Sequence, residues 1–479
     1  MAETKEEKSM EPDQHRMPQV TNSRFQQHYH LIPPQGWMND PNGFTYFQGY
    51  YHLFYQYHPY GVEWGPMHWG HARSRDLVHW ETLPPALAPD SAADESGCFS
   101  GSAIVKDNRL FLIYTGHHVP DADHPDDFWQ TQNVAVSDDG LHFYKLATNP
   151  VIAEPPADNS HHFRDPKVFE HDGAYYLVLG SQVAQTATGR VLLYRSQNLV
   201  DWQFQGVITA AESPTAGFMW ECPDLFRLNG QDVLMMSPQG IPAGKQTNLN
   251  LYQTSYYMGQ FDFATAHYTH AQLRELDHGH DFYAAQTMLA PDGRRIVIGW
   301  LDMWEAPFPE QADGWAGTMT LPRELTSHHD QLMMFPVAEV QQLRTQQLLD
   351  EHWQGTERLL AVPDARHLEL HLQTELNQWQ GTQITLRLHA GQPDLQLTYY
   401  SHTQQLVLQR AGADAQRFAQ LRPTALLDVH VWTDTSSVEI FVNHGEAVFS
   451  ERFYPEVNPQ VTLTADAPVN VDLTAYQLE

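Results

Sequence analysis

The stretch Trp37-Met38-Asn39-Asp40-Pro41-Asn42-Gly43 introduces the unit from which most of this chain is built. Its last four residues are typical of a tight turn, because proline pre-sets φ at the second position and Asn and Gly tolerate the positive φ that follows. The aromatic residue and the methionine before the turn indicate a packed site rather than a free surface loop. A second polar turn, Gly49-Tyr50, leads into an apolar run that ends at Tyr55. A polar turn followed by an apolar strand is therefore the candidate repeating unit.

This unit occurs five times before residue 336, at 49–55, 108–114, 173–179, 230–236 and 293–300. The turns are separated by 59, 65, 57 and 63 residues. In the first three units a serine is followed six residues later by an aromatic residue, at 74–80, 137–143 and 196–202. Five units of about 60 residues, each with room for four strands, predict a five-bladed β-propeller over 24–335. An irregular β-sandwich with chance self-similarity is the alternative.

The regions that flank these units have different patterns. Residues 1–23 are charged and lack periodicity, which predicts a mobile N-terminal tail. After Pro336, apolar residues at helical spacing predict a linker helix over 336–350. From 351 to 479 the alternation of apolar and polar residues predicts antiparallel strands and a C-terminal β-sandwich. The expected fold class is all-β, a five-bladed β-propeller followed by a β-sandwich.

Composition narrows the range of partners. The formal net charge is −31, with Lys+Arg 27 against Asp+Glu 58, so the surface repels nucleic acid and anionic membranes. The 12% aromatic content suits a small neutral ligand such as a sugar, although a β-rich core explains it as well. Cys98 and Cys222 are the only cysteines, which excludes a disulfide framework. The first ten residues lack the apolar core of a signal peptide, and no long apolar run occurs, so a cytoplasmic enzyme is expected.

Three of the five units place a carboxylate at the same position before their turn. Asp40 lies nine residues before Gly49, Asp165 eight before Gly173, and Glu221 nine before Gly230. The second unit has Phe99-Ser100-Gly101-Ser102 at this place, and the fifth has Asp281-Phe282-Tyr283. Because the first strand of each propeller blade lines the central channel, three blades are expected to deliver a carboxylate to one end of it.

Carboxylates that share one site have a characteristic chemistry. Like-charge repulsion raises the pKa of at least one of them, which makes a general acid available near neutral pH. Glycoside hydrolysis uses such a pair, one carboxylic acid and one ionised carboxylate. The alternatives are structural ion pairs, as Arg164 beside Asp165 suggests, or a calcium site. Neither a closely spaced Asp/Asn loop nor zinc-type histidine spacing is present, so neither a metal nor a cofactor is expected.

These motifs resemble those of the family-32 glycoside hydrolases, the invertases and sucrose-6-phosphate hydrolases. Residues 37–43 are similar to the first motif of the family, Arg164-Asp165-Pro166 to the second, and Glu221-Cys222 to the third. Residues 54–56, 64–71, 99–102 and 321–325 match as well. The resemblance covers about 25–335, and the C-terminal region is similar only in its size and β pattern.

The resemblance implies a role for each acid. Asp40 would be the nucleophile and Glu221 the acid/base, while Asp165 would bind fructose hydroxyls and stabilise the transition state. A retaining mechanism of this kind places the two reacting carboxyls about 5–5.5 Å apart. The implied substrate-binding residues are Trp37, Asn39, Gln56, Trp64, Phe99, Ser100, Arg164, Cys222, Tyr283 and Trp300. Trp64 and Phe99 could equally be core aromatics.

The function that the resemblance implies is a retaining β-fructofuranosidase releasing fructose from sucrose. Sucrose 6-phosphate is the near alternative, but a phosphate needs Lys or Arg near the glucose side, and the site motifs contain no basic cluster. A fructosyltransferase, a fructan hydrolase and a non-catalytic sugar-binding propeller remain open. The C-terminal sandwich could form the surface of a homodimer or support the propeller.

Overall fold

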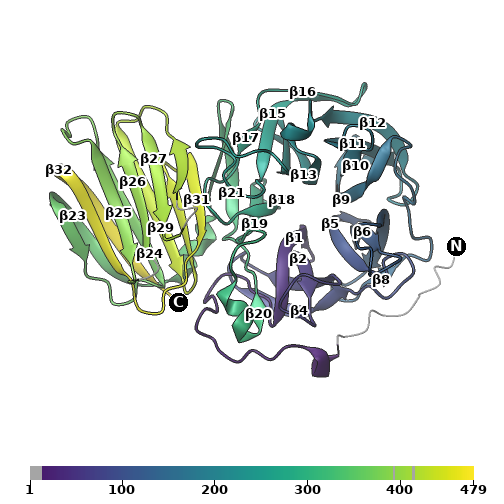
Figure 1. Ribbon diagram of the computed structural model, residues 1–479, viewed down its shortest axis with the longest axis horizontal. Helices are drawn as coiled ribbons and strands as arrows, with labels where there is room; N and C mark the ends of the chain where they lie inside the picture. The colour runs from purple at the N-terminus through teal and green to yellow at the C-terminus, as the bar shows by residue number, and fades with distance from the viewer. Residues whose placement is uncertain (1–12, 392–393, 413–415) are drawn as a thin grey trace.

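The computed structural model describes residues 13–391, 394–412 and 416–479, and this part of the chain is built almost wholly of β-strands (Figure 1). Five blades surround a common centre, and a C-terminal sheet folds over into a sandwich beside them. The predicted fold class is confirmed. Residues 1–12 of the expected tail lie outside the described residues. The rest of that tail includes a short 3-10 helix, η1 (Gln14–Arg16).

Each blade is an antiparallel meander of four strands. The first two blades comprise β1 (Gly36–Phe47), β2 (Tyr50–His58), β3 (His68–Ser74) and β4 (Trp80–Leu87), and β5 (Gly97–Lys106), β6 (Arg109–His118), β7 (Trp129–Ser137) and β8 (Tyr144–Lys145). The third comprises β9 (Asn159–His171), β10 (Ala174–Val183), β11 (Thr188–Ser196) and β12 (Gln203–Ala210). The fourth comprises β13 (Met219–Leu228), β14 (Gln231–Gln239), β15 (Ser255–Asp262) and β16 (His267–His270), with β17 (Arg274–Glu275) beside β15. The fifth comprises β18 (Tyr283–Leu289), β19 (Arg295–Trp300), β21 (Arg323–His328) and β22 (Gln331–Pro336).

Both sequence repeats have a structural cause. The repeated polar turns are the hairpins between the first and second strands of each blade. The repeated serines begin the turn after the third strand in the first three blades. There Ser74, Ser137 and Ser196 each hydrogen-bond to an Asp or Asn side chain two residues later. That side chain then accepts backbone N–H groups of the same turn, which is a local way of satisfying a tight reversal.

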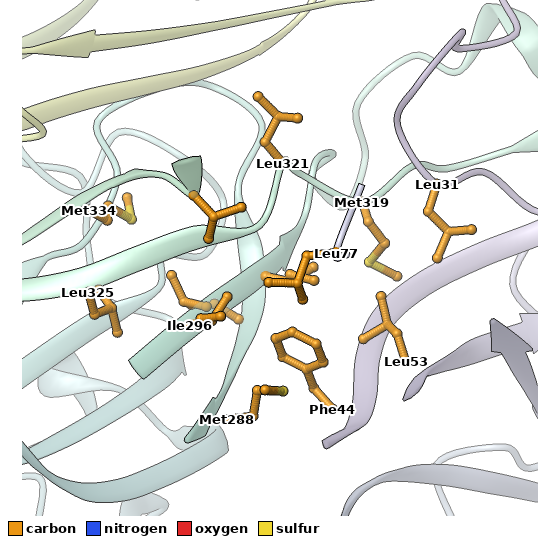
Figure 2. Close-up of a cluster of buried hydrophobic side chains, with 14 of the residues drawn as sticks. Leu31, Phe44, Leu53, Leu77, Met288, Ile296, Met319, Leu321, Leu325 and Met334 are labelled. Atoms are coloured by element: carbon orange, nitrogen blue, oxygen red, sulfur yellow. The ribbon is translucent and has the colours of Figure 1, made fainter. Parts of the chain in front are cut away.

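The ring is closed by a contact between the last and first blades. The two-residue strand β20 (Trp315–Ala316), which follows the 3-10 helix η3 (Pro309–Asp313), pairs in parallel with Gly36 and Trp37 of β1. Figure 2 shows the apolar cluster at this closure, in which Phe44 and Leu53 of the first blade lie with Met288 and Ile296 of the fifth. Burial of these side chains is the main source of cohesion between the two blades.

The predicted linker helix is wrong for most of its length. Only Ala338–Leu343 is helical, as the 3-10 helix η4, and the chain then enters β23 (Arg344–Leu360). From Arg344 onward β23 pairs with β32 (Gln460–Leu478), the last strand of the chain. Continuous pairing with a distant strand satisfies the backbone of this segment and overrides the weak helical periodicity of its sequence.

The C-terminal domain is one continuous sheet folded into two layers. It contains β24 (Leu368–Glu375), β25 (Gln383–His389), β26 (Asp394–Tyr400), β27 (Gln405–Arg410), β28 (Gln416–Gln420), β29 (Leu426–Asp434), β30 (Ser437–Val442) and β31 (Ala447–Arg452). Strand β32 belongs to both layers, because residues 460–465 pair with β25 and residues 472–477 with β24. The apolar side chains between the layers form a core of their own.

A buried network of charges joins the two domains. Arg323 of β21 is completely buried, with Nη1 3.0 Å from Asp277 Oδ2 and Nε donating to Glu439 Oε2 at 3.0 Å. Glu439 Oε1 lies 2.7 Å from His30 Nε2, and His30 Nδ1 lies 2.8 Å from Asp434 Oδ2. Charges withdrawn from water in this way need such partners, so the network fixes how the sandwich sits on the propeller. Within the described chain, none of the helices has the length and apolar character needed to span a membrane.

Candidate active site

The first strand of each blade, its inner strand, contains a β-bulge at an equivalent position. The pairing register shifts between Met38 and Pro41 in β1, and between Phe99 and Gly101 in β5. Equivalent shifts occur opposite residues 164–167 of β9, between 221 and 224 of β13, and between 283 and 286 of β18. Such bulges bend a strand and re-aim a side chain, and here they accompany the predicted site residues of all five blades.

The bulge in the first blade corrects one expectation. Residues 40–43 do not form a separate tight turn, because they lie within β1. The proline is accommodated there by the register shift, and Gly43 takes the positive φ of 53°. In the third and fourth blades Asp165 and Cys222 have positive φ angles of 65° and 48°. Such backbone conformations are costly for residues with a side chain and are typical of functional sites.

The structure brings the three predicted carboxylates together around Cys222. The thiol Sγ lies 3.7 Å from Asp40 Oδ2 and 3.8 Å from Asp165 Oδ2. The backbone N–H of Cys222 donates to Asp165 Oδ2 at 2.9 Å. Glu221 immediately precedes this cysteine on β13. Three blades therefore contribute acids to one cluster, as the spacing of the repeats predicts.

The carboxylates of Asp40 and Glu221 each have their own set of hydrogen-bond donors. The Ser100 hydroxyl donates to Asp40 Oδ2 at 2.7 Å, and the Asn39 amide donates to Oδ1 at 3.0 Å. Glu221 accepts hydrogen bonds from Arg164 Nη2 on Oε1 at 2.7 Å and from the Tyr283 hydroxyl on Oε2 at 2.5 Å. The side chains of both acids are thus held in one orientation, while each remains partly exposed.

Burial and mutual repulsion raise the pKa of Asp40 and of Asp165. Burial raises the pKa of Asp40, and the nearby charge of Glu221 raises it further, against the hydrogen bonds from Ser100 and Asn39. Burial also raises the pKa of Asp165 to about 7; Arg164 opposes this rise, and the charges of Glu221 and Asp40 add to it. Burial and the same three acids raise the pKa of the Cys222 thiol, so it stays neutral and serves as packing.

The other predicted binding residues form the wall and rim. The Trp37 indole donates to Asn39 Oδ1 at 2.7 Å, and the Gln56 amide donates to the carbonyl of Cys98 at 3.0 Å. Trp64 is 48% exposed and contacts Phe99 edge to face, so it is a rim residue rather than a core aromatic. Trp300 is fully buried against Trp37, and it therefore supports the wall from behind and offers no surface to a ligand.

Sequence reasoning missed a row of aromatic and histidine side chains beside Phe99. His117 stacks on Phe99 with ring centroids 4.1 Å apart, and Phe128 packs against both His117 and His162. His162 Nδ1 lies 2.7 Å from Arg164 Nη1. Tyr252 was also not predicted as a site residue, although its ring packs against that of Tyr283. Two of these contacts, Phe128 with His162 and Tyr252 with Tyr283, join neighbouring blades, and the others depend on ring packing, so the spacing of the repeats does not indicate them.

The C-terminal halves of the same strands line a cavity instead of the acid cluster. Residues 44–46, 103–105, 167–171, 224–227 and 287–289 line a cavity of about 600 Å³. In each inner strand these residues follow the site residue, and strands advance about 3.3 Å per residue. The acids therefore lie toward one end of the propeller axis and this cavity toward the other.

Comparisons with known proteins agree with this architecture. The model of the glycosyl hydrolases family 32 N-terminal domain matches residues 30–336, and that of the family 32 C-terminal region matches 339–477. Sucrose-6-phosphate hydrolase of Escherichia coli is 43% identical over 437 residues, covering 90% of each chain. Raffinose invertase of Escherichia coli is 40% identical over 443 residues, again covering 90% of each.

A solved structure extends the likeness to three dimensions. The β-fructofuranosidase of Bombyx mori superposes with a TM-score of 0.87 at 37% identity, covering 96% of this chain and 95% of that one. A mutant of the same Bombyx mori enzyme has also been solved in complex with sucrose. Fold, site and relatives together define a glycoside hydrolase. The chain belongs to glycosyl hydrolase family 32.

Proposed function

We propose that this protein is a retaining β-fructofuranosidase that hydrolyses sucrose to glucose and fructose. The observation that carries the proposal is the convergence of Asp40, Asp165 and Glu221 from three blades on one cluster centred on Cys222. Binding alone does not need an acid beside a nucleophile, so this set favours catalysis over a sugar-binding role.

The two partly exposed acids have the roles of nucleophile and acid/base. Glu221 protonates the bridging oxygen while Asp40 attacks the anomeric carbon of the fructosyl unit, giving a covalent intermediate. Water activated by Glu221 then releases fructose with retained configuration. The fixed donors Ser100 and Asn39 support the nucleophilic role, because they hold Asp40 as an oriented carboxylate.

Asp165 has a binding and stabilising role. Its side chain is nearly buried and one oxygen is occupied by the Cys222 N–H, which suits a positioning group better than an attacking one. With a pKa raised to about 7, it can both donate and accept hydrogen bonds near neutral pH. We therefore assign it to the fructose hydroxyls and to the positive charge that develops on the sugar in the transition state.

The surroundings of the site favour an uncharged sugar. Burial and the nearby Arg164 lower the pKa of His117 to about 3 and that of His162 to about 2, so both are neutral at pH 7. The guanidinium of Arg164 is already paired with Glu221. These three groups therefore provide no free positive charge for a phosphate, which supports sucrose.

Sucrose 6-phosphate is the second candidate, because a relative 43% identical to this chain is named for that substrate. The relative named raffinose invertase, at 40% identity, favours an unphosphorylated sugar. Side-by-side measurement of kcat/KM on sucrose and sucrose 6-phosphate, with products identified, decides between them. We expect the higher kcat/KM on sucrose. The reverse order would show that a positively charged side chain other than Arg164, His117 and His162 binds the phosphate.

Two variants test the catalytic assignment. Asp40→Asn removes the nucleophile and should reduce kcat by a factor of at least about 10⁴ while the thermal midpoint changes little. Glu221→Gln should lose activity on sucrose but retain much of it on an activated fructoside whose leaving group needs no proton. Normal hydrolysis by the first variant, or equal loss on both substrates by the second, would remove the corresponding residue from its role.

A further inference from the structure

Three buried polar residues, which we call the channel bridge, join three inner strands next to the candidate active site. Lys167 of β9, Asp224 of β13 and Thr287 of β18 come from the third, fourth and fifth blades. Lys167 Nζ lies 3.0 Å from Asp224 Oδ2 and donates to the carbonyl of Thr287 at 2.5 Å. Asp224 Oδ2 also accepts the N–H and the hydroxyl of Thr287, both at 2.9 Å. The side chains of Lys167 and Asp224 therefore hold three blades together.

The members of the channel bridge follow site residues on their own strands. Lys167 lies two residues after Asp165, and Asp224 lies three residues after Glu221. In all three strands the bridge residue lies at or just beyond the end of the bulge that accompanies the site residue. Because a bulge interrupts the local pairing, the aim of the side chain it carries depends on where the strand is next held. The channel bridge provides that fixed point.

The strand that carries Lys167 also carries Arg164, which holds the side chain of Glu221. Arg164 reaches from β9 to β13, where Nε and Nη2 donate to Glu221 Oε1 at 3.0 and 2.7 Å. The pair of Lys167 and Asp224 joins the same two strands on the other side of the bulges. A shift of β9 against β13 would therefore change how Arg164 meets Glu221, and it would move Asp165 relative to both.

We propose that Lys167 and Asp224 are positioning residues for the hydrolytic reaction, because their buried pair keeps the carboxylates of three blades in the mutual geometry that the reaction needs. The inference rests on the proposed function and deepens it. Both residues line the cavity at the opposite end of the axis, so they act through the strands and not by touching the sugar. Stability alone does not explain the pair, because an apolar pair of similar volume is often as stable as a buried ion pair.

A small displacement of the acids has a large effect on rate and a small one on binding. Misplacing reacting groups by about 1 Å can cost on the order of a hundredfold in the chemical step. The wall and rim of the site are held by contacts that do not involve the channel bridge, such as Trp37 with Asn39 and Trp64 with Phe99. Loss of the bridge should therefore lower kcat and leave KM nearly unchanged.

The double variant Lys167→Met/Asp224→Asn tests the proposal. Methionine fills the space of the lysine stem without bonding to the other blades, and asparagine still accepts from Thr287 while leaving no unpaired charge. Steady-state kinetics are measured well below the thermal midpoints of variant and wild type. We expect kcat to fall at least about tenfold while KM stays within about threefold of the wild type. A folded double variant whose kcat is within about twofold of the wild type would overturn the proposal.

Two further variants separate positioning from stability. Asp224→Asn alone keeps an acceptor for both Lys167 and Thr287, so its kcat should stay within about threefold of the wild type. Arg344→Met/Glu369→Gln neutralises an ion pair of the C-terminal sandwich in the same way as the double variant, and it should leave kcat unchanged. A loss of kcat in either variant as large as that in the double variant would overturn the proposal.

Thr287→Val keeps the test valid if the double variant folds poorly, because it removes one hydroxyl donor to Asp224 and no charge. Its kcat should fall at least about threefold at unchanged KM, and an unchanged kcat would overturn the proposal. All variants are compared on the fructoside that the wild type hydrolyses fastest. An error in the proposed function would therefore appear in the wild type, whereas an error in the role of the bridge would appear as variants that match it.

Discussion

At the scale of single residues, Asp40 and Asp165 differ in the kind of group that donates hydrogen bonds to them. Asp40 accepts from two side chains, Ser100 and Asn39, whereas Asp165 Oδ2 accepts from the backbone N–H of Cys222. A side-chain donor can be removed by substitution without disturbing the strand, and a backbone donor cannot. The ionisation of Asp40 can therefore be tuned by mutation more cleanly than that of Asp165.

Ser100→Ala should shift the acid limb of the pH profile of kcat/KM to higher pH. The hydroxyl stabilises the ionised form of Asp40, so its hydrogen bond lowers a pKa that burial and Glu221 raise. Without it the pKa of Asp40 rises, and the nucleophile becomes protonated earlier as the pH falls. Loss of a hydrogen bond to a charged group, about 1.5–3 kcal/mol, predicts a fall in kcat/KM of roughly ten- to hundredfold.

Ser102→Ala is the matched control for this experiment. Ser102 lies two residues farther along the same strand, where its hydroxyl donates to the Pro166 carbonyl and accepts the Val168 N–H. Its loss should lower the thermal midpoint and leave the acid limb in place. An acid limb that moves equally in both variants would show that Ser100 acts through general stability and not through Asp40.

Some residues of the site can be predicted from the sequence pattern of their own blade, and others cannot. Asp40, Asp165 and Glu221 could be predicted because each lies eight or nine residues before the turn of its own blade. His117 and His162 could not, because they owe their place to ring contacts with Phe128 rather than to any repeat position. The resemblance implied Trp300 as a binding residue and yet it is buried, since a resemblance in sequence gives the position of a residue and not which neighbours cover it.

At the scale of elements, the regular parts of the chain were predictable and the irregular ones were not. Turn chemistry recurs at nearly constant spacing, so the five blades could be read from local pattern. Strand β23 was mistaken in part for a helix, because its partner β32 lies more than a hundred residues later in the sequence and leaves no local signal. The bulges in the inner strands also depend on pairing, and sequence alone suggested a turn at 40–43.

Gly317→Ala should open the closure between the last and first blades. Gly317 follows β20 and has φ +92°, and an added Cβ would meet the carbonyl oxygen of Met38 at 2.0 Å. Met38 lies on β1, two residues before Asp40, so the clash should displace the nucleophile as well as weaken the ring. We expect the midpoint of urea unfolding and kcat/KM to fall together.

Gly293→Ala separates backbone strain from the clash. Gly293 has the same φ of +92°, but an added Cβ would find nothing within 4 Å. It should cost only the 1–2 kcal/mol or so of a left-handed alanine, whereas Gly317→Ala should cost about 1–3 kcal/mol more from overpacking. Equal destabilisation by the two substitutions would mean that contact with Met38 is not what requires glycine at 317.

At the scale of the whole molecule, the contact between the propeller and the C-terminal sandwich, here called the seam, has a stability that depends on pH through His30. Burial alone would lower the pKa of His30, but hydrogen bonds to Asp434 and Glu439 outweigh it and raise the pKa to about 9. The ordinary value is 6.5, so the folded protein binds a proton in this range that the unfolded chain releases. Stability from this contact is therefore complete below pH 6.5 and is lost as the pH rises through about 9.

His30→Gln should remove this pH dependence. A rise in pKa of this size corresponds to on the order of 3 kcal/mol. The unfolding free energy of the variant should therefore lie furthest below that of the wild type at pH 6 and approach it by about pH 9.5. Urea unfolding across this range measures the difference, and His402→Gln, an exposed histidine of the sandwich, serves as the reference. A gap that stays constant from pH 6 to 9.5 would show that His30 is uncharged at the seam, and Asp434 and Glu439 would then need another source of compensation.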